Sequence, residues 1–455
     1  MAVERPSPRP GLSAFDGAAI VVGIVVGVGL FRSPPVVAAN VPNELAYMAV
    51  WVAGGLIAVI GGLCYAELGS AFPSAGGEYR YLQRAFGRPL AVLFAWARGA
   101  VIQTGAIAVV AFAYADYAQQ LAPLGERGPA IHAAVAVAAL TGLNLIGRGG
   151  AVGVQRLLSM ALVFALVVLV PIVAAGVALG VLPAPPAPPP PSEATTGALG
   201  LAMVFVLLTY GGWNEAAYLG EDLRDPGRDT VRVLVLGLGA VAAIYLIVNL
   251  AFLAVLGLDG LRAADAVGAD LMRATVGEGG AWGVSLAVCI AALSTLNATI
   301  FTGARTSYAL GRDVRVLGWL GGWRPGGENP APALVLQAAV SLALIAFGAA
   351  ARDGFQAMVD YTAPTFWFFM LLVGLAVIRL RMTQPDAPRP FRTPLYPATP
   401  ILFCLTCAYL LYSSIAYTGL GALLGVGVLL AGAPLVWAIL RDEADHNRKA
   451  PAQGE

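Results

Sequence analysis

Ionisable side chains are scarce in this chain of 455 residues. Only 12% of its residues are charged, where an ordinary soluble domain has roughly 25%. Lysine occurs once, as Lys449. Hydrophobic residues make up 58% of the chain, and the mean hydropathy is +0.77. A soluble fold of this length could not bury so much apolar surface. The composition therefore excludes an ordinary soluble domain and predicts a protein embedded in a bilayer.

Residues that bind metals or form disulfides are equally few. The two histidines, His132 and His446, lie far apart, and the four cysteines all lie within apolar runs (Cys64, Cys289, Cys404 and Cys407). An enzyme inside a membrane needs a metal cluster or a nucleophile with a base, and the sequence shows neither pattern. We expect buried free thiols, no cofactor and no enzymatic activity. The formal net charge of +1 gives no reason to expect a nucleic acid partner.

What the chain has in abundance is long apolar segments. A transmembrane helix needs about 20 mostly apolar residues, and such segments recur along the whole sequence. We predict an all-α membrane protein with 12 transmembrane helices, hereafter spans 1 to 12. In order, the predicted spans are 13–40, 44–72, 89–118, 128–147, 153–180, 197–220, 230–257, 280–304, 331–350, 355–380, 398–418 and 420–440.

The basic residues predict how these spans are oriented, because cytoplasmic loops retain arginine and lysine. If the N-terminus is inside, 21 of the 27 basic residues fall in cytoplasmic segments. Both termini are therefore predicted to be cytoplasmic, as tails 1–12 and 441–455. Between them we predict a single transmembrane domain, 13–440, in the cytoplasmic membrane. The proline-rich stretch 183–191 cannot be helical, and we expect it to be an external linker between spans 5 and 6.

Glycines interrupt two of the predicted spans. The runs are Gly23–Phe31 in span 1 and Thr209–Glu215 in span 6. Non-helical backbone inside a membrane is tolerated where it lines a cavity or is buried in protein, and close helix packing is the alternative explanation of such glycines. Both runs lie in the first span of a five-span half, which favours a midplane site. A ligand with a carboxylate and an ammonium group would satisfy both kinds of exposed helix end.

Several motifs, in this order along the chain, resemble those of a known family. They are Gly27–Pro34, the stretch from Tyr65–Gly69 to Ser74–Tyr79, Tyr210–Asn214, the stretch from Leu293–Asn297 to Arg305, and Arg389–Pro400. The chain resembles the amino acid-polyamine-organocation superfamily over nearly its whole length, and within it the L-type amino acid transporters and their bacterial relatives. The resemblance implies a LeuT-like fold, with inverted repeats at about 13–180 and 197–380 and two further helices at about 398–440. It also implies secondary active transport of amino acids, as a permease or exchanger, by alternating access.

The resemblance also implies a substrate site at the two glycine runs. Backbone N–H groups there would bind the substrate carboxylate, backbone carbonyls would bind its ammonium group, and one side chain would line the pocket. The N–H groups are those of Gly27, Val28 and Gly29, the carbonyls are those of Val25, Leu208 and Gly211, and the side chain is that of Asn214.

Two positions depart from the family pattern. Leu208 stands where relatives commonly carry an aromatic gate, and Leu162 stands where many sodium-independent relatives carry a lysine. The identity of a coupling ion therefore stays open between two hypotheses, a sodium site in span 8 and a proton carried by Glu215. The hydroxyls of Ser294 and Thr295, with carbonyls near Gly23 and Val26, could form a sodium site. The alternative to this sodium site is that both hydroxyls only bond back to carbonyls of their own helix.

Two ionisable residues in the spans require their own explanation, because charges at membrane depth are costly. Glu215 could carry a proton or contact a cationic substrate, or it could pair with a nearby arginine or helix terminus. Arg98 in span 3 needs either an acidic partner or a water-filled cavity.

Several alternatives remain at this level. The substrate could be an amine, a polyamine or a cationic amino acid, and a sensor of the same fold would bind an amino acid without moving it. The sequence does not decide between uniport, exchange and symport, nor the oligomeric state. Some relatives join a partner by a disulfide near the external end of span 4. The external loop 119–130 has no cysteine, so we expect no such covalent partner.

Overall fold

The structure is a computed structural model of the whole chain. It describes residues 13–72, 77–146, 196–214, 226–313, 315–322, 330–417, 419–434, 436–437 and 441. The predictions for the terminal tails, span 5, the linker 183–191, Leu162 and Glu215 lie outside these residues. All regular secondary structure in the described ranges is helical.

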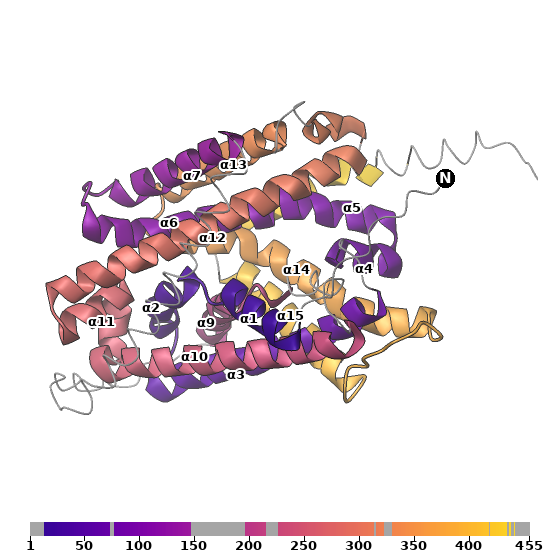
Figure 1. The fold of residues 1–455 in the computed structure, drawn as a ribbon, viewed down its shortest axis with the longest axis horizontal. Helices are drawn as coiled ribbons and strands as arrows, with labels where there is room; N and C mark the ends of the chain where they lie inside the picture. The colour runs from indigo at the N-terminus through magenta and orange to yellow at the C-terminus, as the bar shows by residue number, and fades with distance from the viewer. Residues whose placement is uncertain are drawn as a thin grey trace, which may run out of the picture.

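The described chain folds into long helices joined by short connections (Figure 1). Their bounds are α1 Ala14–Val25, η1 Val28–Phe31, α2 Ser33–Ala39, α3 Glu44–Ala71, α4 Gly77–Phe86, α5 Arg88–Ala97, η2 Arg98–Ile102, α6 Gln103–Leu121, α7 Gly128–Ile146, α9 Thr196–Thr209, α10 Pro226–Ala263, α11 Val267–Thr275, α12 Glu278–Asp313, η4 Arg315–Gly321, α13 Ala331–Gly348, α14 Gly354–Thr383, α15 Ala398–Ala416 and α16 Leu420–Leu430.

Eight described helices are long and apolar enough to cross a membrane when the continuous run of α5, η2 and α6 is counted as one, and two shorter helices are also apolar. This confirms a multi-pass helical membrane protein. Every predicted span contains a helix except span 5, which lies outside the described residues. The predicted end of span 7 coincides with a kink in α10, where Gly257 has a φ of 64°. The total number of spans in the chain stays a prediction.

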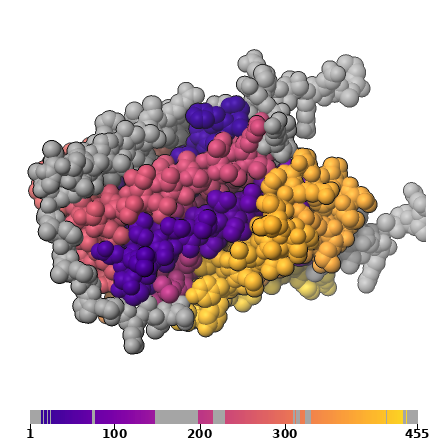
Figure 2. All heavy atoms as spheres, turned by 90° about the horizontal axis from the view of Figure 1, so that it is seen from below, coloured from indigo at the N-terminus to yellow at the C-terminus, as the bar shows by residue number. Residues whose placement is uncertain are grey.

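The helices form two groups with the broken spans between them. In one group α6, α7, α12 and α13 pack against one another, and in the other α3 packs against α10. Figure 1 shows these groups on opposite sides of the molecule, with α1, α2, α9 and α14 in the interior. On one face α3 runs between α10 and the C-terminal helices (Figure 2). Helices from both halves of the chain therefore surround the interrupted segments.

Glycines in α3 allow its close approach to the neighbouring helices. A Cβ atom at Gly54 would lie 2.3 Å from Val206 Cγ1. One at Gly61 would lie 2.7 Å from atoms of Trp213 and Phe403. Small residues are used in this way at membrane helix interfaces because backbones can then pack closely. The packing holds α9, which leads directly into the second glycine run, against α3.

A buried ion cluster joins α3 to α14 and the connection that follows it. The Glu67 carboxylate accepts hydrogen bonds from Arg381 at 2.7 and 2.6 Å and from the Thr393 N–H at 2.7 Å. Arg389 Nε lies 3.5 Å from the same carboxylate. Glu67 is 2% exposed, so its charge depends on these donors rather than on water.

We expect Arg381→Met to destabilise the protein strongly. Losing the bidentate partner would leave Glu67 a buried charge without its main counterion, which costs about 3–5 kcal/mol. The thermal unfolding midpoint of detergent-purified protein measures the effect. Arg273→Met is the matched control, because Arg273 pairs with Asp270 and Glu278 in a half-exposed position, where a pair contributes about 0–1 kcal/mol. Equal midpoints for the two variants would contradict the prediction.

Candidate functional site

Span 1 is interrupted where the first glycine run was predicted to break it. Helix α1 ends at Val25, Gly27 is extended with a φ of −131° and a ψ of −173°, and the 3₁₀ turn η1 begins at Val28. In the part of the chain that the structure describes, the N–H groups of Val28 and Gly29 have no hydrogen-bond partner. Free N–H groups at a helix start carry a partial positive charge and attract anions.

Span 6 is interrupted at the second run. Helix α9 ends at Thr209, and the Gly211 N–H donates to the Leu208 carbonyl at 3.0 Å to form a tight turn. Gly212 has a φ of 104°, a conformation that glycine adopts without steric cost. A short 3₁₀ segment, Trp213 and Asn214, follows. Because α9 does not continue, its last carbonyls have no N–H groups of a following helical turn to accept from, and they carry partial negative charge.

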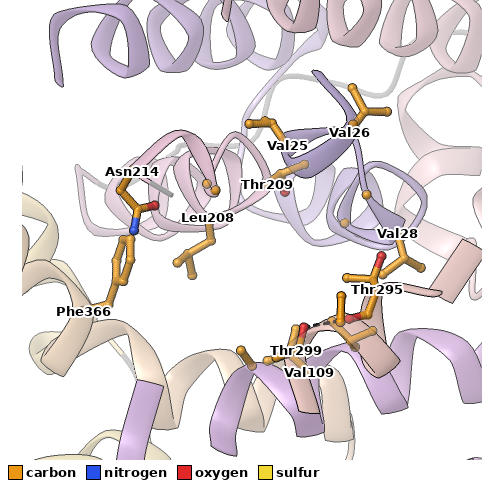
Figure 3. Close-up of a pocket in the computed structure, with 18 of the residues that line it drawn as sticks. Val25, Val26, Val28, Val109, Leu208, Thr209, Asn214, Thr295, Thr299 and Phe366 are labelled. Atoms are coloured by element: carbon orange, nitrogen blue, oxygen red, sulfur yellow. Dashed lines mark hydrogen bonds between the residues drawn. The ribbon is translucent and has the colours of Figure 1, made fainter. Parts of the chain in front are cut away.

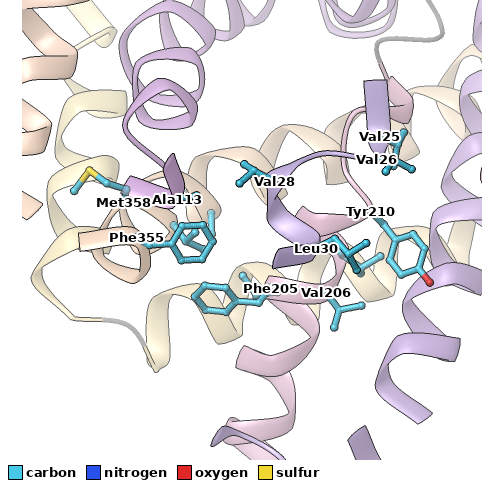
Figure 4. Close-up of a cluster of buried hydrophobic side chains, with 14 of the residues drawn as sticks. Val25, Val26, Val28, Leu30, Ala113, Phe205, Val206, Tyr210, Phe355 and Met358 are labelled. Atoms are coloured by element: carbon cyan, nitrogen blue, oxygen red, sulfur yellow. The ribbon is translucent and has the colours of Figure 1, made fainter. Parts of the chain in front are cut away.

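The two interruptions lie side by side. A Cβ atom at Gly29 would lie 3.6 Å from Thr209 Cα. The Thr209 hydroxyl donates to Ser33 Oγ at 2.6 Å, which joins the end of α9 to the start of α2. Figure 4 shows hydrophobic side chains of both segments packed in one cluster, among them Val28, Leu30 and Phe205. Positive and negative helix ends are thus presented to a common space.

Tyr245 of α10 joins the two interruptions, which we did not foresee. Its hydroxyl lies 2.8 Å from the Val25 carbonyl and 3.0 Å from the Thr209 carbonyl, so one buried donor serves the last residues of α1 and α9. Asn249, one turn further along α10, donates to the Tyr245 carbonyl and accepts from the Tyr47 hydroxyl. A tyrosine and an asparagine four residues apart in an aliphatic span were the signal that could have found this contact.

A cavity of about 1550 Å³ lies beside the interruptions. It exceeds the roughly 300–1,000 Å³ of typical small-molecule pockets, so it can hold a small ligand together with a water-filled path. Its walls include all the predicted substrate and sodium residues that the structure describes: Gly23, Val25, Val26, Gly27, Val28, Gly29, Leu208, Gly211, Asn214, Ser294 and Thr295. Figure 3 shows Val25 and Val26 on one side of the cavity and Thr299 and Val109 on the opposite side.

One end of the cavity meets an aromatic pair and a buried arginine. Phe205 and Phe355 line the cavity with ring centroids 6.1 Å apart. Arg32, which directly follows η1, lies over the Phe355 ring and pairs with Asp116 at 2.5 Å and Asp353 at 2.6 Å. Side chains from α6, α9 and α14 are therefore held together at this end.

The structure also shows the surroundings of the proposed sodium residues and of Arg98. The Thr295 hydroxyl lies 3.3 Å from the Ala291 carbonyl, which is the helix back-bonding alternative considered above. No group of three or more acidic, histidine or cysteine side chains that could hold a metal is found among the described residues. Arg98 has both an acidic partner and a place in the cavity wall, since it lies 2.8 Å from Glu78 and both line the cavity.

Comparison with known proteins now adds to this geometry. A family model described as amino acid permease matches residues 12–439, nearly the whole chain. The chain belongs to the amino acid permease family. This is a family of transporters, so the permease is not an enzyme.

Curated relatives of this permease are also transporters. The b(0,+)-type amino acid transporter 1 of Mus musculus is 29% identical over 420 residues, which cover 91% of the permease and 84% of the relative. The large neutral amino acids transporter small subunit 2 of Homo sapiens is 28% identical over 423 residues, covering 91% and 78%. Both similarities cover most of the permease rather than an isolated segment.

We expect Tyr245→Phe to loosen both interruptions together. The hydroxyl is the shared donor for two buried carbonyls, and losing such a bond costs about 1–3 kcal/mol, equivalent to roughly tenfold or more in local opening. Hydrogen–deuterium exchange of peptides covering 25–31 and 209–214 measures this opening. Tyr412→Phe, whose side chain is exposed on α15, is the control and should leave both peptides unchanged. Faster exchange in only one peptide would show that Tyr245 does not join them.

Proposed function

We propose that this permease is a secondary transporter that moves amino acids across the cytoplasmic membrane by alternating access. The observation that carries the proposal is the meeting of two interrupted spans at one cavity. One interruption presents unpaired N–H groups and the other presents carbonyls, and an amino acid carries a carboxylate and an ammonium group at matching ends. The names of the curated relatives support an amino acid as the substrate.

In this proposal the carboxylate binds at η1. The N–H groups of Val28 and Gly29 stand at the start of η1, and helix starts attract anions. The N–H of Gly27, the third predicted donor, lies against the Tyr245 hydroxyl. The ammonium group binds at the carbonyls of Leu208 and Gly211. The Val25 carbonyl contributes as well, since a carbonyl oxygen has two lone pairs and the Tyr245 hydroxyl takes one of them.

We further propose the LeuT-like arrangement of two inverted five-span repeats followed by two helices, within a domain at 13–440. The spans that are interrupted are the first and the sixth, which occupy equivalent places in the two repeats. The packing of α3 on α10 brings together spans 2 and 7, and that of α6 on α12 brings together spans 3 and 8. These pairs are also five spans apart, as a repeat of five predicts.

The residues that line the cavity support a carrier conformation that is open on one side of the membrane and closed on the other. The cavity wall extends to Phe15 and Ala18 near the start of α1, whereas Phe205 and Phe355 line its other end, beside Arg32. With both termini cytoplasmic, as the distribution of basic residues predicts, the open side is the cytoplasmic one. Alternating access would then require the ion pairs of Arg32 to separate when the carrier opens outward.

The coupling ion and the absence of a covalent partner subunit are also proposals. A sodium site at Ser294 and Thr295 and a proton carried by Glu215 are the two coupling hypotheses. We propose that the permease works without a disulfide-linked partner, because the connection between α6 and α7 contains no cysteine.

Counterflow of labelled amino acids in proteoliposomes tests the proposed function. We expect saturable exchange with the wild type and a loss of about tenfold or more in Gly211→Ala, because the new Cβ would lie 2.8 Å from the Leu208 carbonyl and displace a proposed ligand of the ammonium group. Gly283→Ala is the matched control, since nothing lies within 4 Å of its Cβ. Binding without counterflow would support a sensor, and exchange only of amines would support the alternative substrates.

The same vesicles separate the two coupling hypotheses. If sodium binds at α12, Ser294→Ala with Thr295→Ala should raise the sodium concentration for half-maximal uptake by about tenfold. If Glu215 carries a proton, Glu215→Gln should abolish the pH dependence of uptake. Uptake by the wild type that depends on neither sodium nor pH would refute both hypotheses.

A further inference from the structure

Glu78 is a buried carboxylate in the cavity wall that the proposed substrate site does not use. It is 1% exposed and lies near the start of α4, the short helix between spans 2 and 3. Arg98 approaches it to 2.8 Å, and both side chains line the cavity. Two opposite charges are therefore buried together next to the path that a ligand would take.

The Glu78 carboxylate gathers donors from separate parts of the chain. Its Oε2 atom accepts from Arg98, while its Oε1 atom accepts from the Tyr65 hydroxyl at 2.8 Å and from Asn214 Nδ2 at 3.2 Å. Tyr65 belongs to α3 and Asn214 to the segment directly after the break in span 6. Because an ionised carboxylate offers acceptors at both oxygens, it can hold all three donors at once.

Local backbone geometry places Arg98 for this contact. Arg98 begins a π-helical turn, Arg98–Ile102, between α5 and α6. Such wide turns inside helices are frequently found at functional sites. An arginine within a span is costly unless it is paired, and Glu78 supplies the opposite charge.

The segment after the span 6 break is held on two sides. The rings of Trp213 and Tyr65 make an edge contact with centroids 5.0 Å apart, and the next residue, Asn214, bonds to Glu78. Tyr65 and Glu78 are themselves hydrogen-bonded. The position of Trp213 and Asn214 beside the cavity is thus set by an aromatic contact and a carboxylate together.

From these contacts we propose that Glu78 is a positioning residue for transport, which holds Asn214 and the segment after the span 6 break against the cavity, with Arg98 as its counterion. The inference rests on the proposed transport function and adds two residues to it. It also assigns them to one side of the membrane. Glu78 lies on the α4 side of the break, which the orientation proposed above places toward the cytoplasm.

The test compares substrate affinity at the two membrane faces. Counterflow of a labelled amino acid is measured over a range of concentrations in inside-out and right-side-out membrane vesicles. In Glu78→Gln we expect the KM at the α4 face to rise about tenfold, as for the loss of one hydrogen bond to a charged group, with the KM at the other face unchanged. A glutamine has one acceptor end, so either orientation of its amide sets an NH₂ group against Arg98 or Asn214.

A double variant separates positioning from charge loss. Glu78→Gln with Arg98→Met removes both charges and leaves the glutamine oxygen free to accept from Asn214 and Tyr65. We expect the KM at the α4 face to return to within about threefold of the wild type, because the pair is coupled. If Glu78→Gln alone does not fold, Tyr65→Phe keeps both charges, removes one donor, and should raise the same KM by about threefold.

Glu67→Gln is the matched control, because Glu67 is also a buried glutamate paired with an arginine but does not line the cavity. It should lower the thermal midpoint without changing the KM at either face. Glu78→Gln behaving in the same way would overturn the positioning role and leave the transport function standing. A wild type that shows no saturable counterflow at either face would instead overturn the transport function, and the inference with it.

Discussion

The hydrogen-bonding requirement of the backbone inside a membrane governs the rest of this structure. A peptide group at that depth has no water to bond to, so a chain can leave the helical conformation only where other groups satisfy it. Among the described residues, the permease leaves it inside spans 1 and 6, after Val25 and after Thr209. The one hydroxyl of Tyr245 is shared between carbonyls at both places, while the N–H groups of Val28 and Gly29 have no partner among the described residues and line the cavity. The unsatisfied groups are the ones that a substrate could complete.

Scarcity of charge gives the few buried ions defined structural roles. Arg32, Arg98 and Arg381 each lie 2.5–2.8 Å from an acidic partner distant in the sequence. Arg32 joins helices at one end of the cavity, Arg98 stands in its wall, and Arg381 joins α14 to α3. Because each pair joins separate helices, the ion pairs help to set the geometry of the cavity.

Several features of the site could be predicted from residue types alone. Glycine runs in otherwise apolar spans located both interruptions, because glycine tolerates the backbone conformations needed there. The prediction that Arg98 needed an acid or a cavity followed from the cost of burying a charge, although the partner could not be named. Tyr245 and Glu78 were missed as members of the site. A polar pair in an aliphatic span marked Tyr245 as unusual, but nothing in the local sequence of either residue shows which helices pack beside it.

By itself the sequence determined that this chain crosses a membrane many times, roughly where most of its long apolar helices lie, and where two of them break. These properties depend on hydropathy over about 20 residues and on backbone preferences of glycine and proline, which are local. Only the tertiary structure decided which groups meet: the two breaks across Tyr245, Glu78 with Arg98 and Asn214, and Arg32 with Asp116 and Asp353. Those contacts join residues 20 to 321 positions apart, and helix packing, rather than any local pattern, brings them within bonding distance.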